Sequence, residues 1–232
     1  MTRRGVLGAL FGGIAALALA TCGSTKRIRY KMTVEVDTPE GLKTGYAVRE
    51  VRFSEAPNVL ALGESRPQWR LKGEAVAIDL PGGRPLFALL SSARNDSEYA
   101  ARIPYEHMGW MSSEGTRDGP VELWPNVPVK LHHNPSQLKP SYLPMLVTFR
   151  DTSSPESVVA VEAEALEAAF GPGVRLRRIT VERTRESVTA GLETRLEWLS
   201  EQRGSLDYTG QLHPEHREKD VTEHAFWQGI KE

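Results

Sequence analysis

The stretch Arg27-Ile-Arg-Tyr-Lys-Met-Thr-Val-Glu-Val-Asp37 decides the fold, because polar and apolar residues alternate along it at every step. One set of alternate positions is apolar: Ile28, Tyr30, Met32, Val34 and Val36. The other set is charged or polar: Arg27, Arg29, Lys31, Thr33 and Glu35. Successive side chains of a β-strand point to opposite faces, so this period of two predicts a half-buried strand. Its basic outer face is either solvated or, beside a membrane, close to anionic headgroups.

A second strand is predicted directly after the first. The sequence Thr38-Pro-Glu-Gly41 is typical of a turn, and Gly45 is expected to end the connection. Within residues 46–54 the apolar positions change phase midway, and a β-bulge at Arg49-Glu50 would re-aim the side chains. The two strands are therefore predicted to form a hairpin with a longer loop.

The remainder of the first half is typical of antiparallel strands. Residues 74–80 alternate again, and the turn Pro81-Gly-Gly-Arg84 leads into a continuous apolar run at 86–90, as in a buried strand. Residues 91–120 are polar and irregular, with an aromatic and sulfur-rich patch at 107–111 that either lines a pocket or caps a core. Residues 121–131 are predicted to be extended, and their prolines would confine them to a sheet edge or an irregular segment.

Helical spacing appears only in the second half. Residues 143–149 predict an apolar strand, after which Ser153-Ser-Pro-Glu156 is typical of a helix start, with apolar spacing that continues to Phe170. Residues 174–184 predict another strand, and residues 187–201 predict a second helix. The apolar stripe of that second helix consists of Val188, Leu192, Leu196 and Leu199.

Together these elements predict an α+β fold. An antiparallel, β-rich N-terminal half built of hairpins precedes a C-terminal half in the order strand-helix-strand-helix. Residues 27–135 are accordingly predicted to form a β-rich domain or subdomain and residues 136–205 an α/β subdomain. Residues 206–232 are predicted to form a polar C-terminal tail.

The first 21 residues have the pattern of an export signal. Arg3 and Arg4 supply positive charge, and an uncharged apolar run follows at 6–20. Leu19-Ala-Thr-Cys22 resembles a bacterial lipobox, in which cleavage precedes a cysteine that carries lipid on its sulfur. The resemblance implies a signal peptide at 1–21, an acylated Cys22 and a tether of only 22–26. Cys22 is the single cysteine of the chain, which fits a sulfur committed to a thioether.

Three alternatives remain open for this leader. Thr21 stands where Gly, Ala or Ser is usual, and cleavage after Ala18-Leu-Ala20 would release a soluble protein that begins at Thr21. The uncharged run 5–25 is also long enough to span a bilayer uncleaved, although its glycines disfavour a helix. Arg3-Arg4 further resembles a twin-arginine signal, which would export the domain already folded.

The composition excludes some classes of function. The chain has 29 Lys and Arg against 30 Asp and Glu, a formal net charge of −1. A nucleic-acid-binding protein normally has a clear basic excess, so we predict no nucleic-acid partner.

Several stretches resemble an uncharacterised family of proteobacterial exported proteins. They are Met145-Leu-Val-Thr-Phe-Arg150, Phe170-Gly-Pro-Gly-Val-Arg-Leu-Arg-Arg-Ile-Thr-Val-Glu182, and the segments 30–53 and 73–90. These motifs are turns, strands and helix ends. The family has no known activity, so the resemblance implies no catalytic residues.

The C-terminal tail contains the one candidate metal site. If Pro214 opens a helix, then His216, Asp220 and His224 recur every four residues and share a face, with His213 just before them. Two imidazoles and a carboxylate are possible zinc ligands. The alternative is a solvated terminal helix with charge pairs, and we predict no cofactor.

No known catalytic motif is present. The sequence lacks a Gly-x-Ser-x-Gly elbow, a His-Glu-x-x-His pair, a P-loop and a Rossmann glycine pattern. Glu162, Glu164 and Glu167 resemble paired carboxylates, but their expected place is a solvated helix surface. We therefore predict no catalytic residues.

The predicted function is that of a lipoprotein of the cell envelope. Its acylated Cys22 would anchor it to a bacterial membrane, facing the periplasm, with a non-catalytic structural role or a role in binding an unknown protein partner. One alternative is an exported hydrolase or metal-dependent enzyme that uses some of the six histidines of the chain: His107, His132, His133, His213, His216 and His224. Another is a soluble periplasmic ligand-binding protein, which requires cleavage before Thr21.

Overall fold

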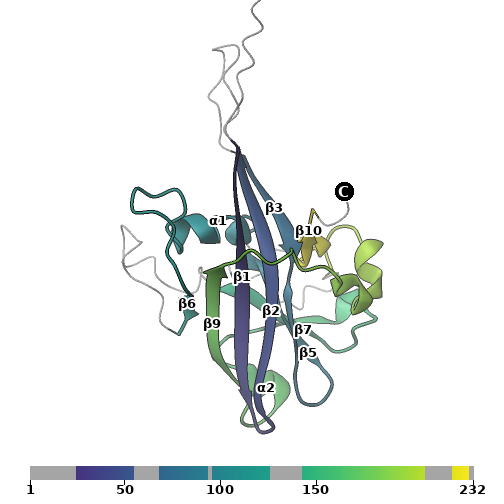
Figure 1. Ribbon diagram of the computed structural model, residues 1–232. Coiled ribbons are helices and arrows are strands. Elements are labelled where there is room, and N and C mark those ends of the chain that lie inside the picture. The colour runs from purple at the N-terminus through teal and green to yellow at the C-terminus, as the bar shows by residue number, and fades with distance from the viewer. Residues whose placement is uncertain (1–24, 55–67, 94–95, 126–142, 207–220, 230–232) are drawn as a thin grey trace, which may run out of the picture.

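The protein consists of two antiparallel sheets and few helices (Figure 1). The computed structural model describes residues 25–54, 68–93, 96–125, 143–206 and 221–229. The first sheet has the order β10-β3-β2-β1-β9-β6 and the second the order β4-β5-β7-β8. The strands of the first sheet are β1 (Thr25–Thr38), β2 (Gly41–Ser54), β3 (Gln68–Glu74), β6 (Val121–Trp124), β9 (Arg175–Arg183) and β10 (Trp227–Gln228). Those of the second are β4 (Val76–Asp79), β5 (Pro85–Ser92), β7 (Pro144–Phe149) and β8 (Val158–Val161). The predicted antiparallel β-rich architecture is thus confirmed.

The hairpin of β1 and β2 is the longest feature of the molecule (Figure 1). All five apolar residues of the predicted alternation in β1 are buried, which confirms this strand. The predicted longer loop is wrong, because only Pro39 and Glu40 separate the two strands. The predicted bulge is wrong too, since the pairing runs without a shift from Thr25↔Ser54 to Thr38↔Gly41. Strand β2 keeps its phase and points the Arg49 side chain inward.

The two sheets come into closest contact where β4 passes over β2. A Cβ atom on Gly45 would lie against the carbonyl oxygen of Ala77 and 2.7 Å from Cγ1 of Ile78. Gly45 therefore belongs to β2 and permits this approach, instead of ending the turn as predicted. The chain itself passes from the first sheet to the second at Ala75, between β3 and β4.

Two apolar cores result from this arrangement. The larger lies between the sheets and contains the inner face of β1 together with Leu86, Ala88 and Leu90 of β5. The smaller covers the other face of the second sheet. Its members include Phe87 and Leu89 together with Leu192, Leu196, Leu199, Leu206, Val221, Ala225 and Phe226. Strand β5 is thus buried on both faces, as its continuous apolar run predicts.

The helix predicted from Ser153 to Phe170 is wrong. The segment forms a 3₁₀ turn η3 (Pro155–Ser157), strand β8, and the short helix α2 (Leu166–Phe170). The sequence Val158-Val-Ala-Val161 is rich in β-branched residues and pairs with β7 at the edge of the second sheet. A strand that completes a buried sheet outweighs helical spacing here.

The helix predicted at 187–201 is also wrong. Residues 184–191 cross the outer face of β2, where Thr189 N donates to Val48 O at 3.0 Å and Val48 N donates to Thr189 Oγ1 at 2.8 Å. Two 3₁₀ helices follow, η4 (Leu192–Thr194) and η5 (Glu197–Ser200). Three residues of the predicted stripe are nevertheless buried in the smaller core: Leu192, Leu196 and Leu199.

One helix falls inside the segment predicted to be irregular. Helix α1 (Tyr99–Glu106) packs on the larger core through Ile103, and Tyr30 Oη donates to the carbonyl oxygen of Ala100 at 2.7 Å. The aromatic and sulfur-rich patch follows α1 and caps that core, since His107 and Met108 are fully buried. A last 3₁₀ turn, η7 (Glu223–Ala225), precedes β10.

Strands from both halves of the sequence pair with one another. Strand β9 pairs with β1 in the first sheet, and β7 pairs with β5 in the second. The ranges 27–135 and 136–205 therefore each contribute strands to both sheets.

Candidate functional site

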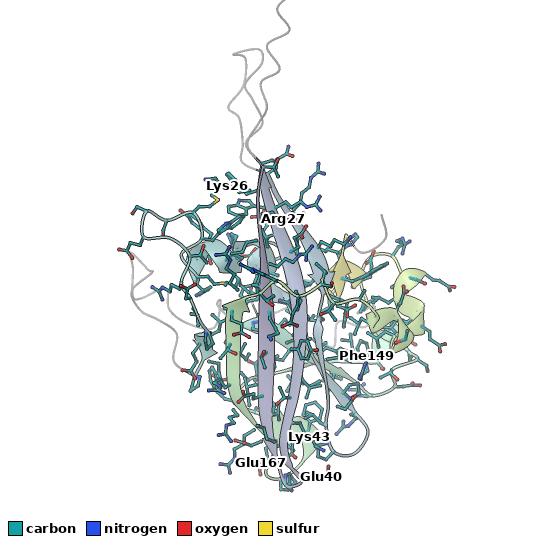
Figure 2. All side chains as sticks on the ribbon, in the orientation of Figure 1. Lys26, Arg27, Glu40, Lys43, Phe149 and Glu167 are labelled. Carbon is teal, nitrogen blue, oxygen red and sulfur yellow. The ribbon has the colours of Figure 1, made fainter. Side chains whose placement is uncertain are left out.

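Basic side chains gather on the outer face of the first sheet, at the end where β1 begins. Arg27 of β1 lies opposite Arg52 of β2, and Arg52 lies opposite Arg70 of β3. Residues directly opposite in a sheet point to the same face, so three arginines form one row across three strands. Figure 2 places Lys26 and Arg27 at this end of the hairpin, with Glu40 and Lys43 at the other.

The next row along the sheet contains a buried carboxylate between two cations. Arg29 lies opposite Glu50, and Glu50 lies opposite Lys72. We call the five cationic residues of these two rows the basic end: Arg27, Arg29, Arg52, Arg70 and Lys72.

Glu50 is the negatively charged centre of the basic end. Its side chain is only 2% exposed, and its two oxygens accept hydrogen bonds from Nε of Arg29 at 2.8 Å and Nε of Arg52 at 2.9 Å. The Nε atom of Arg27 lies 4.0 Å away. Burial alone would raise the pKa of Glu50, but the hydrogen bonds and charges of Arg29 and Arg52 outweigh burial and hold that pKa below its usual value.

A hollow of about 360 Å³ lies over this carboxylate. Its lining consists of Arg29, Glu50, Arg52, Lys72, Ser187, Val188 and Ala190. The last three residues belong to the crossing segment that Thr189 fixes to Val48. Three cationic side chains thus surround one carboxylate, and the hollow carries an excess of positive charge.

The inner face at the same end of the sheet is aromatic. Trp69 of β3 lies opposite Phe53 of β2, with ring centroids 4.8 Å apart. Tyr105 and Trp110 each lie 6.0 Å from the Trp69 ring, and Tyr105 is 53% exposed. We call these four residues the aromatic cluster. Cationic and aromatic side chains therefore lie on opposite faces of the same strand ends.

The other end of the outer face, near the β1–β2 turn, carries matched charges. Arg178 Nη2 donates to Glu35 Oε1 at 2.7 Å, and Arg177 Nη1 donates to Asp37 Oδ1 at 3.1 Å. We call these four residues the turn end. Midway along β1, Lys31 lies 3.2 Å from Glu182 and 2.9 Å from Glu186.

A second buried charged group lies between the sheets. The Arg49 guanidinium donates to the carbonyl oxygens of Glu74 at 3.1 Å and Ala88 at 3.4 Å, and lies 3.5 Å from the Met32 sulfur. The Glu74 side chain accepts the Leu192 N–H at 3.0 Å. Burial raises the pKa of Glu74, with backbone hydrogen bonds and the charge of Arg49 opposing that rise. Because these contacts join both sheets to the start of η4 at Leu192, we assign them a structural role.

Most of the sequence-predicted site residues lie outside the described residues. These are Thr21, Cys22, His213, His216 and Asp220. His224 lies in η7 with its side chain 76% exposed, 3.7 Å from Glu223. Within the described part of the chain, no three His, Cys, Asp or Glu residues are close enough to hold a metal ion.

The other histidines of the predicted enzyme alternative are similarly placed. His107 is fully buried beneath the α1 region, and His132 and His133 lie outside the described residues. The two described histidines, His107 and His224, thus differ completely in exposure.

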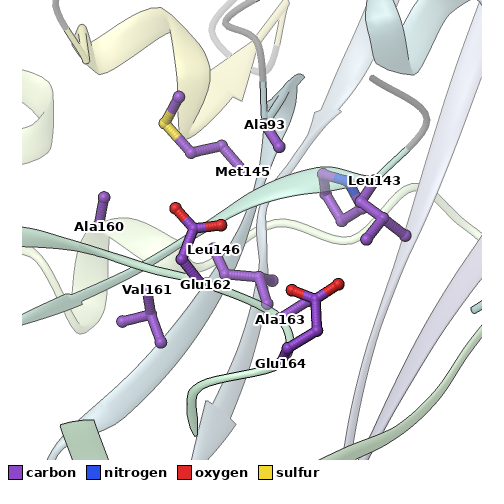
Figure 3. Close-up of a pocket in the computed structure, with 10 residues that line it drawn as sticks. Ala93, Leu143, Met145, Leu146, Ala160, Val161, Glu162, Ala163 and Glu164 are labelled. Atoms are coloured by element: carbon purple, nitrogen blue, oxygen red, sulfur yellow. The ribbon is translucent and has the colours of Figure 1, made fainter. Parts of the chain in front are cut away.

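Two of the three glutamates considered as paired carboxylates lie beside β8. Figure 3 shows Glu162 and Glu164 next to a pocket that β7, β8 and Ala93 enclose. The pocket measures about 30 Å³, room for no more than a few water molecules. Glu167 lies apart from them in α2, where its Oε1 accepts the Gly173 N–H at 3.3 Å.

A larger hollow of about 490 Å³ lies beside η5 and includes Arg195, Glu197 and Trp198. Arg195 is already paired there, since its Nη1 and Nη2 atoms donate to the two Asp79 oxygens at 2.6 and 3.0 Å. This hollow is lined by one cationic and two acidic side chains (Arg195, Glu197 and Glu201), whereas cationic side chains are in excess around the hollow over Glu50.

Sequence reasoning missed the basic end as a site. It recognised the basic face of β1 but placed a bulge at Arg49-Glu50, which removes the register that brings Arg27, Arg52 and Arg70 together. The available signal was the polar alternation of Glu50, Arg52, Arg70 and Lys72, two residues apart within each strand.

Comparisons with known proteins identify no relative of this chain. Neither protein-family models, nor curated proteins, nor solved structures give a significant match to the chain. Among the described residues, no helix has the length and apolar character needed to cross a membrane.

Proposed function

We propose that this protein is a lipid-anchored lipoprotein of the bacterial cell envelope that faces the periplasm. Its role is non-catalytic, either structural or in binding a protein partner beside the membrane. The acyl anchor is on Cys22, after removal of the leader 1–21. The resemblance to a lipobox at residues 19–22 implies both the acylation of Cys22 and a very short tether, residues 22–26.

The observation that carries the proposal is the composition of the strand ends nearest Cys22. Strand β1 begins at Thr25, and three residues span at most about 10 Å. A lipid on Cys22 would therefore hold this end of the first sheet at the bilayer surface. The basic end and the aromatic cluster both lie here, and Arg, Lys, Trp and Tyr are the residues enriched at membrane–water interfaces.

The opposite end of the sheet supports the partner-binding role. Leu42 and Tyr46 of β2 are 52% and 56% exposed. They lie on the outer face toward the turn, so an anchored protein would present them away from the membrane. Exposed apolar side chains in that position are available to a protein partner.

Intact mass spectrometry of the membrane fraction from the native host tests the anchor. We expect a mature chain that begins at Cys22 and carries added acyl mass. A Cys22→Ser variant is the control, and it should lose both the acyl mass and this cleavage. An unmodified chain that begins at Thr21 would contradict the proposal and favour a soluble periplasmic protein.

A further inference from the structure

We propose that the hollow over Glu50 binds the phosphodiester of an anionic phospholipid headgroup. The inference rests on the membrane attachment proposed above and adds to it a ligand site in the folded domain. The acyl chain would then hold the protein to the bilayer, and the basic end would set how the domain is oriented on it.

The first argument is the unbalanced charge of the basic end, in which Arg52 lines the hollow and Arg27 and Arg70 lie beside it. Like charges directly opposite each other in a sheet are destabilising, yet Arg27, Arg52 and Arg70 form such a row across three strands. Glu50 is the only carboxylate that an ion pair links to these arginines among the described residues. A bound anion would relieve the remaining repulsion. The whole chain has a net charge of −1, so this positive excess is local.

The second argument is the supply of hydrogen-bond donors. Arg52 uses its Nε atom on Glu50, and its terminal nitrogens donate to no other described residue. Arg70 and Lys72 form no ion pair within the described ranges. A guanidinium whose orientation is already fixed through Nε presents its remaining N–H groups as a fork, which matches two oxygens of a phosphate.

The third argument is size and reach. About 360 Å³ lies within the range of small-ligand sites and accommodates a phosphate with its adjoining glycerol. Strand residues rise about 3.3 Å each, so the Arg29 row lies about 13 Å along β1 from Thr25. The short tether therefore keeps the strand ends, and the site a few residues further along them, close to the headgroup layer.

The aromatic cluster identifies the source of the phosphate as a lipid. A site for a free anion needs only the cationic side chains of the outer face. Here Trp69 and the exposed Tyr105 lie at the same level on the inner face, where they can enter the interfacial region beside the headgroups. Both faces of the strand ends would then contact the headgroup region.

A ligand titration of the purified full chain in nonionic detergent tests the proposal. The ligands are short-chain phosphatidylglycerol, short-chain phosphatidylcholine and inorganic phosphate, with affinity measured by calorimetry and binding confirmed by a rise in Tm. We expect phosphatidylglycerol to bind and to raise Tm. We expect phosphatidylcholine and inorganic phosphate to bind at least tenfold more weakly.

Matched charge-neutral variants locate the site. The double variant Arg52→Gln/Lys72→Gln should bind phosphatidylglycerol roughly 30-fold more weakly, from about 1 kcal/mol per basic residue. The double variant Lys43→Gln/Arg177→Gln removes one lysine and one arginine near the turn and should bind as the parent does. Far-UV circular dichroism and Tm without ligand establish that each variant is folded.

Three results would overturn the proposal. Equal binding of inorganic phosphate and phosphatidylglycerol would make this a free-anion site, and equal loss in both double variants would mean nonspecific charge attraction. No binding of any ligand would leave the hollow without this function. None of these results depends on acylation of Cys22, so failure here is distinct from failure of the anchor.

Discussion

The two ends of the outer face of the first sheet differ in their balance of charge. At the turn end, Glu35 and Asp37 each have an arginine of β9 within hydrogen-bond distance. At the basic end, three of the five cationic side chains (Arg27, Arg29 and Arg52) share the single buried carboxylate of Glu50, and Arg70 and Lys72 form no ion pair with a described residue. The same strands, β1 and β2, run through both ends, so the sheet itself does not impose the imbalance.

The difference separates a structural role from a binding role. Matched surface pairs such as those of the turn end contribute little to stability and need no ligand. An excess of one sign, with like charges directly opposed, lowers the stability of the free domain. Such an arrangement is consistent with an external anion, and its position beside the proposed anchor makes a membrane headgroup the natural source.

Replacing the central carboxylate of each end should give the largest difference in the free energy of unfolding between the two ends. Glu50→Gln removes the buried negative charge that the part-exposed Arg29 and Arg52 share, and we expect the free energy of unfolding to fall by about 2–3 kcal/mol. Glu35→Gln at the turn end, where the side chain is 14% exposed, should cost less than about 1 kcal/mol. Urea unfolding at pH 7 measures both. Equal losses would show that Glu50 has no special part in the basic end.

The pH dependence of stability should reveal the same carboxylate. The pKa of Glu50 is lower in the folded chain than in the unfolded one, so its contribution is fully present above the unfolded value of about 4.3. That contribution is lost as pH falls through the folded pKa. Over the pH range below that unfolded value, the unfolding free energies of the parent and Glu50→Gln should therefore draw together. A difference that stays constant over this range would contradict the lowered pKa.

Single arginine substitutions should change stability in opposite directions at the two ends. Arg70→Thr removes a like-charge neighbour of Arg52 and should raise the unfolding free energy by about 0.2–0.5 kcal/mol at low salt. Arg178→Thr breaks the pair with Glu35 and should lower it by a similar amount. Both changes should shrink in 1 M salt, because screening weakens exposed charge interactions. Thermal unfolding at 20 mM and 1 M salt provides the comparison, and a stabilising Arg178→Thr would refute the matched pairing.

Alternation predicted β1 correctly because its five inward positions are all apolar. In β2 the same rule failed at Arg49, since an arginine rarely occupies the interior. The carbonyl oxygens that make this burial possible belong to Glu74 and Ala88, 25 and 39 residues away. No local pattern could supply those partners, and a bulge was the simplest local alternative.

The second half shows a different limit of sequence reasoning. Val158 and Val161 fit helical spacing, but pairing with β7 makes them an edge strand. For the candidate site, the sequence displays every cation of the basic end. What it lacks is the register, which alone brings Arg27, Arg52 and Arg70 to one level across three strands.

A depth measurement on the anchored protein tests the central claim most directly. Cys22 is the only cysteine and would be acylated, so a cysteine introduced by Gln68→Cys or Leu42→Cys can take a single spin label. Gln68 begins β3 at the basic end, and Leu42 lies near the turn. In vesicles that contain phosphatidylglycerol, power saturation should place the label at 68 among the headgroups and the label at 42 in water. If both labels lie in bulk water, or the label at 42 lies deeper, the basic end does not dock on the membrane.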